Sequence, residues 1–183
     1  MSIDTAVFRQ QFNDGCVFAY PTEAVYGLGC NPLNKTAMEK ILALKQRPVE
    51  KGVILIAANT DQIKPFVKLS SLSHEARHHM NEHWPGPYTY LVPKTSHTPP
   101  WISGDSGLVA VRVSAHPLVC ELCLAVDSPI ISTSANHAGK APAKTAEDVQ
   151  HYFDDEVVLI DGSLGTQSKP STIINAITME KLR

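Results

Sequence analysis

The sequence lacks the features that mark several large classes of protein. It has four cysteines in 183 residues, too few for a disulfide scaffold of this length. Its formal net charge of −2 gives no overall excess of positive charge, so any contact with RNA must come from a local patch. No apolar run approaches the roughly 18 residues of a membrane span, and no basic start precedes an apolar run. We therefore expect a cytoplasmic protein with no membrane association.

Two short motifs resemble metal or redox sites, but their surroundings favour simpler interpretations. Cys120 and Cys123 have the C-x-x-C spacing, yet they lie inside the apolar stretch PLVCELCLAV, which is typical of the middle of a helix. Redox pairs lie at a helix N-terminus, and a zinc ribbon needs a second such pair. His74 and His78 in HEARH match the zincin spacing, but their helix is polar throughout and no third ligand follows. We predict buried cysteines and a solvated helix face, and assign no metal site.

The order of elements predicts an α/β open sheet. Apolar runs with strand character alternate with segments of helical periodicity. The predicted strands cover residues 16–20, 52–58, 88–93, 108–113, 129–132, 156–161 and 172–177. The turn-rich stretch 26–32 and the segment 99–107 are predicted as irregular, the second as a long exposed loop. No repeat, linker or break in composition interrupts the chain, so we expect a single domain over residues 1–183.

Compact polar and cationic side chains occur next to several of these strands. Ser132, Ser134 and Asn136 belong to the stretch ISTSANHAGKAP, whose short donors at the end of a strand suit a closely approaching ligand. Lys45, Arg47 and Lys51 fall within seven residues. They are suited to gripping a polyphosphate, although a cationic helix C-terminus that complements the helix dipole is an equal alternative. Neither a P-loop nor a dinucleotide fingerprint is present.

Arg112 lies within the otherwise apolar strand LVAVRV. A guanidinium group is rarely buried without a partner, so Arg112 requires an anion. That anion is either an internal carboxylate or the carboxylate of a ligand. The loop 163–172 repeats the pattern of small hydroxyls and a lysine before a strand. Because open α/β sheets bind ligands at strand ends, these segments together indicate a binding site.

Six blocks of the sequence, in order, resemble the YrdC/TsaC family of threonylcarbamoyl-AMP synthases. They are YPTEAVYGLGCNP (20–32), KQRPVEKGVILIA (45–57), WPGPYTYLVP (84–93), VAVRVSAHP (109–117), STSANHAGKAP (132–142) and SKPSTI (168–173). The resemblance implies a twisted, mixed open sheet with flanking helices and a concave, positively charged face. It also implies a nucleotidyl transfer in which L-threonine, bicarbonate or CO2 and ATP, with Mg2+, give threonylcarbamoyl-AMP and pyrophosphate. Partner proteins of the tRNA threonylcarbamoylation pathway then modify the adenosine beside the anticodon.

The resemblance also implies roles for individual residues. Lys45 and Arg47 would be catalytic and bind ATP, and the nucleotide would also contact Lys51, Ser134 and Asn136. L-threonine would be held by Thr22, Arg112, Ser132 and Ser171, and Tyr26 would line the pocket. No protein nucleophile is required for such a transfer, which agrees with the lack of any triad-like arrangement.

Some positions depart from the pattern of longer members of that family. Ala24, Ile56 and Asn175 stand where threonine, histidine and aspartate are common, which concerns the contacts to threonine. The printed sequence resembles a short, stand-alone form. The alternative function is a non-catalytic RNA-binding or ribosome-maturation factor that uses the same basic face. The hydroxyl-rich segments favour the enzyme, because a surface that only binds RNA has no need of them.

Overall fold

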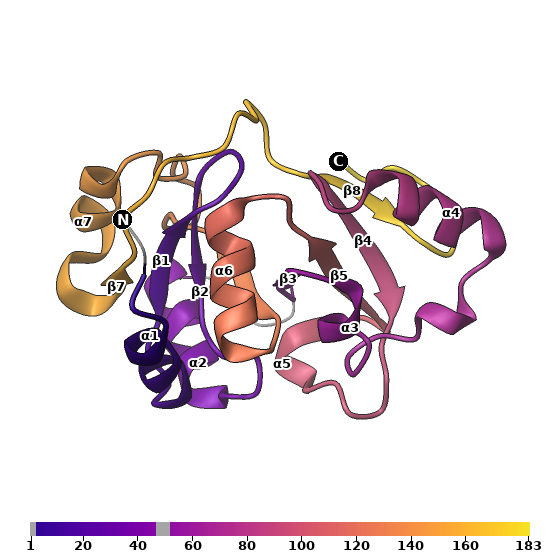
Figure 1. Cartoon of the computed structure of the whole chain (residues 1–183), viewed down its shortest axis with the longest axis horizontal. Coiled ribbons are helices and arrows are strands. Elements are labelled where there is room, and N and C mark those ends of the chain that lie inside the picture. Colours follow the sequence, from indigo (N-terminus) through magenta and orange to yellow (C-terminus); the bar gives the residue numbers. More distant parts are fainter. Residues whose placement is uncertain (1–2, 47–51) are drawn as a thin grey trace.

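The computed structural model describes residues 3–46 and 52–183 and is built around a mixed sheet of eight strands (Figure 1). The strand order is β7-β1-β2-β6-β3-β5-β4-β8. The pairs β1–β7, β3–β5 and β4–β8 are parallel and the others are antiparallel. The strands are β1 Phe18–Pro21, β2 Tyr26–Gly29, β3 Ile54–Ala57, β4 Tyr88–Pro93, β5 Leu108–Val113, β6 Ile130–Ser134, β7 Val158–Leu159 and β8 Thr172–Asn175. The predicted twisted, mixed open sheet with flanking helices is confirmed.

Seven α-helices flank the sheet in the described ranges. They are α1 Thr5–Asn13, α2 Lys35–Lys45, α3 Thr60–Ile63, α4 His74–His83, α5 Pro100–Ser103, α6 Pro117–Val126 and α7 Ala146–Phe153, with 3-10 turns at η2 Leu69–Ser71 and η3 Asp154–Glu156. Side-chain caps explain several starts. Asp4 accepts from the backbone of α1, Asn34 from that of α2, and Thr145 forms a capping box with Asp148 at α7. None of these helices is long and apolar enough to cross a membrane.

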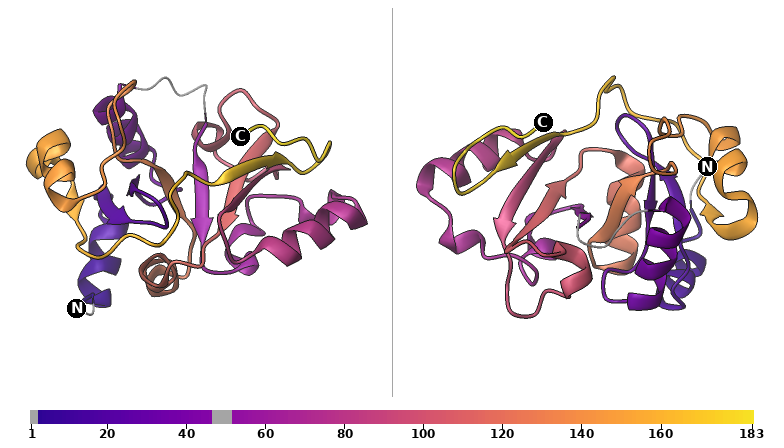
Figure 2. Two further views of the ribbon diagram at one scale, coloured as in Figure 1. Left: turned by 90° about the horizontal axis from the view of Figure 1, so that it is seen from above. Right: turned by 180° about the vertical axis from the view of Figure 1, so that it is seen from behind.

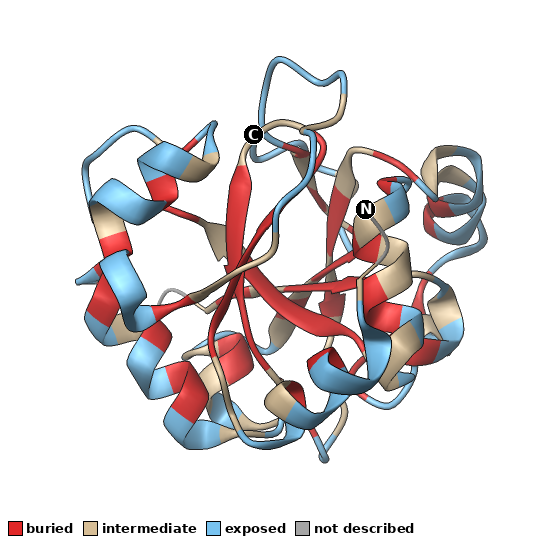
Figure 3. Cartoon of the chain, turned by 60° about the vertical axis from the view of Figure 1, so that its left-hand side comes forward, coloured by how far each residue is buried: buried red, intermediate tan, exposed pale blue. Residues whose placement is uncertain are grey.

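The alternation of side chains along each strand gives the sheet two different faces. On one face, residues such as Leu55, Tyr90, Val111 and Ile131 form a continuous apolar core. Figure 3 shows that the central strands of the sheet are largely buried. The other face is divided along its length. At one end α1 and α6 cover an apolar cluster that includes Ile56. Within residues 3–46 and 52–183, no long helix packs against the rest of that face, which we call the uncovered half. The candidate site lies there, with the short helix α5 at its border.

The structure corrects three of the expected elements. The stretch 26–32 was predicted as a turn but contains strand β2, because its glycines permit close approach to β6. The segment 99–107 was predicted as an exposed loop, but it contains α5, whose Ile102 and Ser103 are buried. The strand predicted for 156–161 is only two residues long. The rest of that run begins a connection between the two edges of the sheet.

This connection, residues 160–171, joins β7 at one edge of the sheet to β8 at the other. It therefore passes across the whole width of the molecule, as the view from above shows (Figure 2). We call it the crossing segment. Two of its backbone N–H groups, those of Gly165 and Gln167, donate to Thr22 and Glu23 in the turn between β1 and β2. The crossing segment is thereby fixed over the uncovered half of the sheet.

Candidate functional site

A cavity of about 550 Å³ lies between the uncovered half of the sheet and the crossing segment. Its floor is built on neighbouring strands, where Gly27, Ala110 and Ser132 contribute small side chains and Ile54 contributes a larger apolar one. A Cβ added at Gly27 would lie 3.3 Å from Thr22 Cγ2 and 3.4 Å from Ser132 Oγ. The cavity thus exists because bulky side chains are missing from one part of a sheet that is otherwise densely covered.

The cavity brings together most of the residues predicted from the sequence. Thr22, Tyr26, Arg112, Ser132, Ser134 and Ser171 all line it, although they come from three strands and two connecting segments. Glu23, Gln167 and Arg183 also line the cavity and were not predicted from the sequence, and Lys169 was predicted only as part of its loop. Each of them stands outside a strand, and although Glu23 and Lys169 lie within blocks that resemble the family, no local pattern distinguishes their side chains from the neighbouring polar residues.

Arg112 is buried at the edge of the cavity and pairs with an internal carboxylate. Its Nη2 atom lies 2.6 Å from Glu23 Oε1, and its Nε donates to the carbonyl of Gly86 at 3.0 Å. Burial lowers the pKa of Arg112, and the charge of Glu23 opposes this effect. Of the two anions that the sequence left open, the internal one is therefore present. Arg112 also belongs to the residues that line the cavity.

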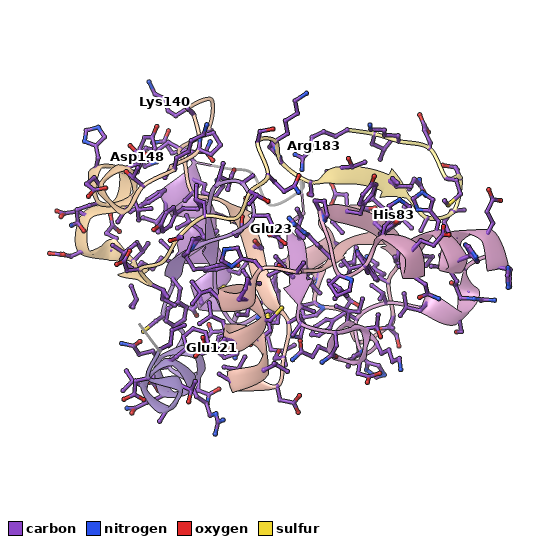
Figure 4. The ribbon with its side chains drawn as sticks, turned by 45° about the horizontal axis from the view of Figure 1, so that its top comes forward. Glu23, His83, Glu121, Lys140, Asp148 and Arg183 are labelled. Carbon is purple, nitrogen blue, oxygen red and sulfur yellow. The ribbon has the colours of Figure 1, made fainter. Side chains whose placement is uncertain are left out.

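Glu23 is held by the segment that follows β5. Its Oε1 atom accepts hydrogen bonds from Ser114 Oγ at 2.7 Å and from the backbone N–H of Ala115 at 3.3 Å. Gln167 N–H donates to the backbone carbonyl of Glu23, and Gly165 permits this approach. A Cβ at Gly165 would lie 2.8 Å from the Cα of Glu23. The carboxylate is consequently fixed from two sides, near the centre of the molecule (Figure 4).

The hydroxyl groups around the cavity are held in defined positions. Thr22 Oγ1 donates to the carbonyl of Val25 at 2.8 Å, and Tyr26 OH donates to the carbonyl of Gly162 at 3.1 Å. Ser171 Oγ lies 2.8 Å from Thr89 Oγ1. Arg183 donates from Nε to the carbonyl of Ser171 at 3.1 Å and from Nη2 to its Oγ at 3.4 Å. The bonds of Ser171 fix the rim of the cavity on the side of β8, and those of Thr22 and Tyr26 fix it near the turn between β1 and β2.

Lys45 and Asn136 are not among the residues that line the cavity, but they support the loop that follows β6. Lys45 Nζ donates to the carbonyl of Asn136 at 2.9 Å, to its Oδ1 at 3.3 Å, and to the carbonyl of Ser134. Asn136 Oδ1 also accepts from Ser134 Oγ at 2.6 Å, while its Nδ2 donates to the carbonyls of His137 and Lys140. The structure therefore places Lys45 and Asn136 beside Ser134 but not in the cavity wall. Arg47 and Lys51 lie outside the described residues.

The two short motifs have structural surroundings that explain them. Cys123 is fully buried and Cys120 is partly buried, and both thiols are free, as predicted for apolar cysteines. Burial raises the pKa of both thiols. His74 and His78 lie on an exposed face of α4, and His78 Nδ1 lies 3.3 Å from Glu82 Oε2. Within residues 3–46 and 52–183, no group of three His, Cys, Asp or Glu side chains is arranged to hold a metal ion.

The three positions that depart from the longer sequences lie in different surroundings. Ala24 lines the cavity. Ile56 is buried in the apolar cluster under α6 and is paired in register with Arg112. Asn175 ends β8, where its Oδ1 accepts from the backbone N–H of Ile177 at 2.9 Å. Among these three, Ala24 therefore has the most direct access to a ligand.

Comparison with known proteins decides the family. The sequence model of the Sua5/YciO/YrdC family, described as "Telomere recombination", matches residues 10–183. The chain belongs to this family. It is 50% identical over 176 residues to a threonylcarbamoyl-AMP synthase of Pseudoalteromonas atlantica, and the aligned residues make up 96% of this chain and 94% of the relative. It is 48% identical over 167 residues to the protein of the same name from Klebsiella pneumoniae, and the aligned residues make up 91% of this chain and 88% of that relative.

Solved structures agree with the family. Sua5 of P. abyssi, crystallised with L-threonine, superposes with a TM-score of 0.86 at 32% identity and covers 96% of this chain. The chain spans 52% of that Sua5 chain, about half of its length. E. coli YciO superposes with a TM-score of 0.81 over 99% of this chain and 92% of its own, at 23% identity. At that identity the likeness to YciO supports the fold alone.

Proposed function

We propose that the protein is an L-threonylcarbamoyladenylate synthase. It would convert L-threonine, bicarbonate or CO2 and ATP into threonylcarbamoyl-AMP and pyrophosphate. The observation that carries the proposal is the convergence of Arg112 with the hydroxyl groups of Thr22, Ser132, Ser134 and Ser171 in one cavity. The relatives named threonylcarbamoyl-AMP synthase and the L-threonine complex of P. abyssi Sua5 support it.

The reaction brings two anions together, and the cavity suits this task. The amine of threonine and CO2 form a carbamate, whose oxygen attacks the α-phosphorus of ATP while pyrophosphate leaves. Positioning and charge neutralisation provide most of the catalysis in such transfers. Arg112, Lys169 and Arg183 supply positive charge around the cavity in the described part of the chain. Arg47 and Lys51 would add phosphate contacts from the segment that precedes Gly52, which itself lines the cavity.

Each predicted residue then has a role that its position allows. Arg112, with Ser132 and Ser171, would bind the carboxylate of threonine, and Thr22 and Tyr26 would shape the pocket around it. Ser134 would contact the nucleotide. Lys45 and Asn136 would contribute by fixing the Ser134 loop, which adds a supporting role to the direct ATP contact expected for them. The catalytic roles of Lys45 and Arg47 remain proposals.

The residues of the cavity fit a Mg2+ ion that arrives bound to ATP. Mg2+ is usually held by substrate phosphates, water and one or two carboxylates rather than by a full protein cage. Among the described lining residues, Glu23 has the only carboxylate side chain, and it already pairs with Arg112. The ion would neutralise phosphate charge, and its ligands would come mainly from the nucleotide and water.

The product would be used outside this site. Threonylcarbamoyl-AMP is a mixed anhydride, so another protein must bring the tRNA adenosine that receives the threonylcarbamoyl group. We propose that other proteins of the tRNA threonylcarbamoylation pathway are the partners, with tRNA contact at the positive face. We further propose that the whole chain forms one YrdC-like domain.

The function can be tested by incubating the protein with radiolabelled bicarbonate, L-threonine, ATP and Mg2+. We expect a labelled adenylate and an equal amount of pyrophosphate, both dependent on threonine. The variant Glu39→Gln is a matched control, because Glu39 is exposed on α2 and does not line the cavity. Release of pyrophosphate without threonine, or no labelled adenylate, would contradict the proposal.

A further inference from the structure

His116 lies between strand β5 and helix α6, and its ring holds the crossing segment. Its Nε2 atom lies 3.0 Å from the backbone carbonyl oxygen of Ser163. Because a carbonyl oxygen can only accept, the imidazole must carry a hydrogen on Nε2. His116 is 7% exposed, and it is not one of the described residues that line the cavity. It therefore contacts the segment that borders the site without being part of the cavity wall.

Helix capping does not explain the side chain of His116. The residue is the N-cap of α6, a position from which a side chain often accepts a hydrogen bond from the first backbone N–H groups of the helix. The ring of His116 makes no such bond to α6. In the described part of the chain, Nδ1, the acceptor nitrogen of the neutral ring, is buried without a partner. A buried polar atom without a partner costs free energy, so the bond that Nε2 makes is the better explanation of the ring.

The bond to Ser163 closes a ring of contacts beside the cavity. The backbone N–H of His116 donates to Ser114 Oγ at 3.1 Å, and Ser114 Oγ donates to Glu23 Oε1 at 2.7 Å. Further along the crossing segment, the N–H of Gln167 donates to the backbone carbonyl of Glu23 at 3.0 Å. The turn between β1 and β2, the segment after β5 and the crossing segment are thus tied to one another.

Close packing limits the crossing segment next to this bond. A Cβ added at Gly162 would lie 3.1 Å from Leu118 Cδ2 and 3.1 Å from Pro21 Cγ. Tyr26 OH donates to the carbonyl of Gly162 at 3.1 Å. Two side chains therefore hold neighbouring carbonyls of the crossing segment, Tyr26 from the lining of the cavity and His116 from outside it.

We propose that His116 is a positioning residue for the reaction at this site. Its Nε2–H group holds the crossing segment in place, and Gln167, Lys169 and Ser171 of that segment line the cavity. A small displacement of the groups around a substrate weakens binding or slows the reaction strongly. The effect on catalysis rests on the proposed function, whereas the anchoring of the crossing segment does not.

The first test uses the wild-type protein and nuclear magnetic resonance of its isotope-labelled imidazole rings at alkaline pH. We expect the ring of His116 to carry its hydrogen on Nε2, and this hydrogen to exchange slowly with water. The signal is assigned by its loss in His116→Gln. A hydrogen on Nδ1 instead would overturn the inference, and this result does not depend on the folding of any variant.

The second test compares His116→Gln with His116→Asn by hydrogen exchange. The amide of glutamine can place an N–H group at the position of Nε2, whereas that of asparagine reaches only the position of Nδ1. In His116→Asn, the backbone amides of Gly165 and Gln167 should exchange roughly 3- to 10-fold faster, the effect of losing one hydrogen bond. In His116→Gln they should exchange at nearly the wild-type rate, and exchange in β5 should be unchanged in both variants. Wild-type exchange at these two amides in His116→Asn would overturn the inference.

Kinetics then tests the positioning role. In the proposed reaction, His116→Asn should raise the KM for L-threonine by roughly 3- to 10-fold and leave kcat within about twofold, because no reacting group is lost. His116→Gln should resemble wild type, and so should the matched control His97→Asn, at an exposed position. Faster exchange with an unchanged KM would show that the anchor does not serve the site. If wild type forms no adenylate, the proposed function fails, and hydrogen exchange alone then confirms or overturns the anchoring by His116.

Discussion

Arg112 and Glu23 show how one pair of residues serves both the fold and the site. Among the ion pairs of residues 3–46 and 52–183, theirs is the one in which both side chains are buried, while the others join exposed groups. A buried pair adds little net stability compared with apolar residues, but removal of one partner leaves an isolated charge. The pair is therefore better explained by what it does in the cavity than by what it adds to stability.

We predict that Arg112→Met lowers the free energy of unfolding by about 3–5 kcal/mol, because Glu23 is then buried without its partner. Adding Glu23→Gln should recover most of this loss, since both charges are then absent. Urea denaturation of the two single variants and the double variant measures the effect. In the proposed reaction, both variants that lack Arg112 should also show a strongly raised KM for L-threonine. Equal urea midpoints for Arg112→Met and wild type would contradict the assignment.

At the scale of elements, the loop that follows β6 depends on the C-terminal end of α2. Lys45 is 3% exposed and ties the carbonyls of Ser134 and Asn136 to that helix. A hydrogen bond that involves a charged group contributes more than a neutral one, and Lys45 makes several. Support for the site thus comes from a helix that lies outside the cavity.

We expect Lys45→Met to lower the free energy of unfolding by about 1.5–3 kcal/mol through loss of these charged hydrogen bonds. In the proposed reaction it should also raise the KM for ATP, because the Ser134 loop loses its anchor. The control is Lys40→Met, at an exposed position of the same helix. Chemical denaturation and steady-state kinetics measure both effects. Indistinguishable behaviour of the two variants would refute the supporting role.

Helix α4 meets strand β4 through a cluster of rings that includes two stacked histidines. The rings of His79 and His83 are 4.1 Å apart, and His79 Nδ1 lies 2.7 Å from Tyr90 OH. Tyr88 and Trp84 complete the cluster. The cluster is separate from the cavity, since His83 lies far from Glu23 (Figure 4). Burial lowers the pKa of His79, and His83 lowers it further, although Glu82 and Glu75 oppose this.

This lowered pKa predicts a loss of stability in acid. The unfolded chain takes up a proton at His79 near the ordinary pKa of about 6.5, whereas the folded protein takes it up only at lower pH. The contribution of His79 is therefore fully present above that value and falls as the pH drops toward the folded pKa. His79→Gln should flatten the dependence of the unfolding free energy on pH between 7.5 and 5.5. His97→Gln, in an exposed loop, is the control and should leave it unchanged.

Elements with a clear hydrophobic period could be predicted from the sequence. Elements whose structure depends on tertiary packing could not. Strands β4 and β5 have the predicted bounds, because their apolar runs are flanked by proline, glycine and charged residues. Strand β2 was missed because its glycines suggest a turn. Yet a Cβ at Gly29 would lie 2.3 Å from the carbonyl of Ile131, so the sheet requires glycine there. The partner of Arg112, Glu23, is 89 residues earlier in the chain, and no local pattern indicates such a pairing.

On the scale of the whole molecule, two apolar clusters lie on opposite faces of one sheet. Cys30 belongs to the larger cluster and Cys123 to the cluster under α1 and α6. Burial raises the pKa of Cys30 to about 12 and raises that of Cys123 as well. The reactivity of each thiol thus reports whether the apolar cluster on its face of the sheet has unfolded. If the chain is a single domain, as proposed, both thiols should become reactive together.

We predict that both thiols react with a thiol reagent only on global unfolding, at the same denaturant concentration. The partly exposed Cys16 and Cys120 should react at lower concentrations. Mass spectrometry after pulse labelling across a urea gradient identifies the modified residues. Labelling of Cys123 well before Cys30 would show that the two faces unfold separately.

The small residues in the floor of the cavity limit which substitutions this protein can accept. At the position of Ala110, which lines the cavity, a sheet selected only for stability would carry valine or leucine. The substitution Ala110→Leu should raise the melting temperature of the ligand-free protein, because the larger side chain fills the space that a ligand would occupy. At this position the sheet gives up apolar packing in favour of open space, so a substitution that improves the packing would remove the space that the proposed reaction needs.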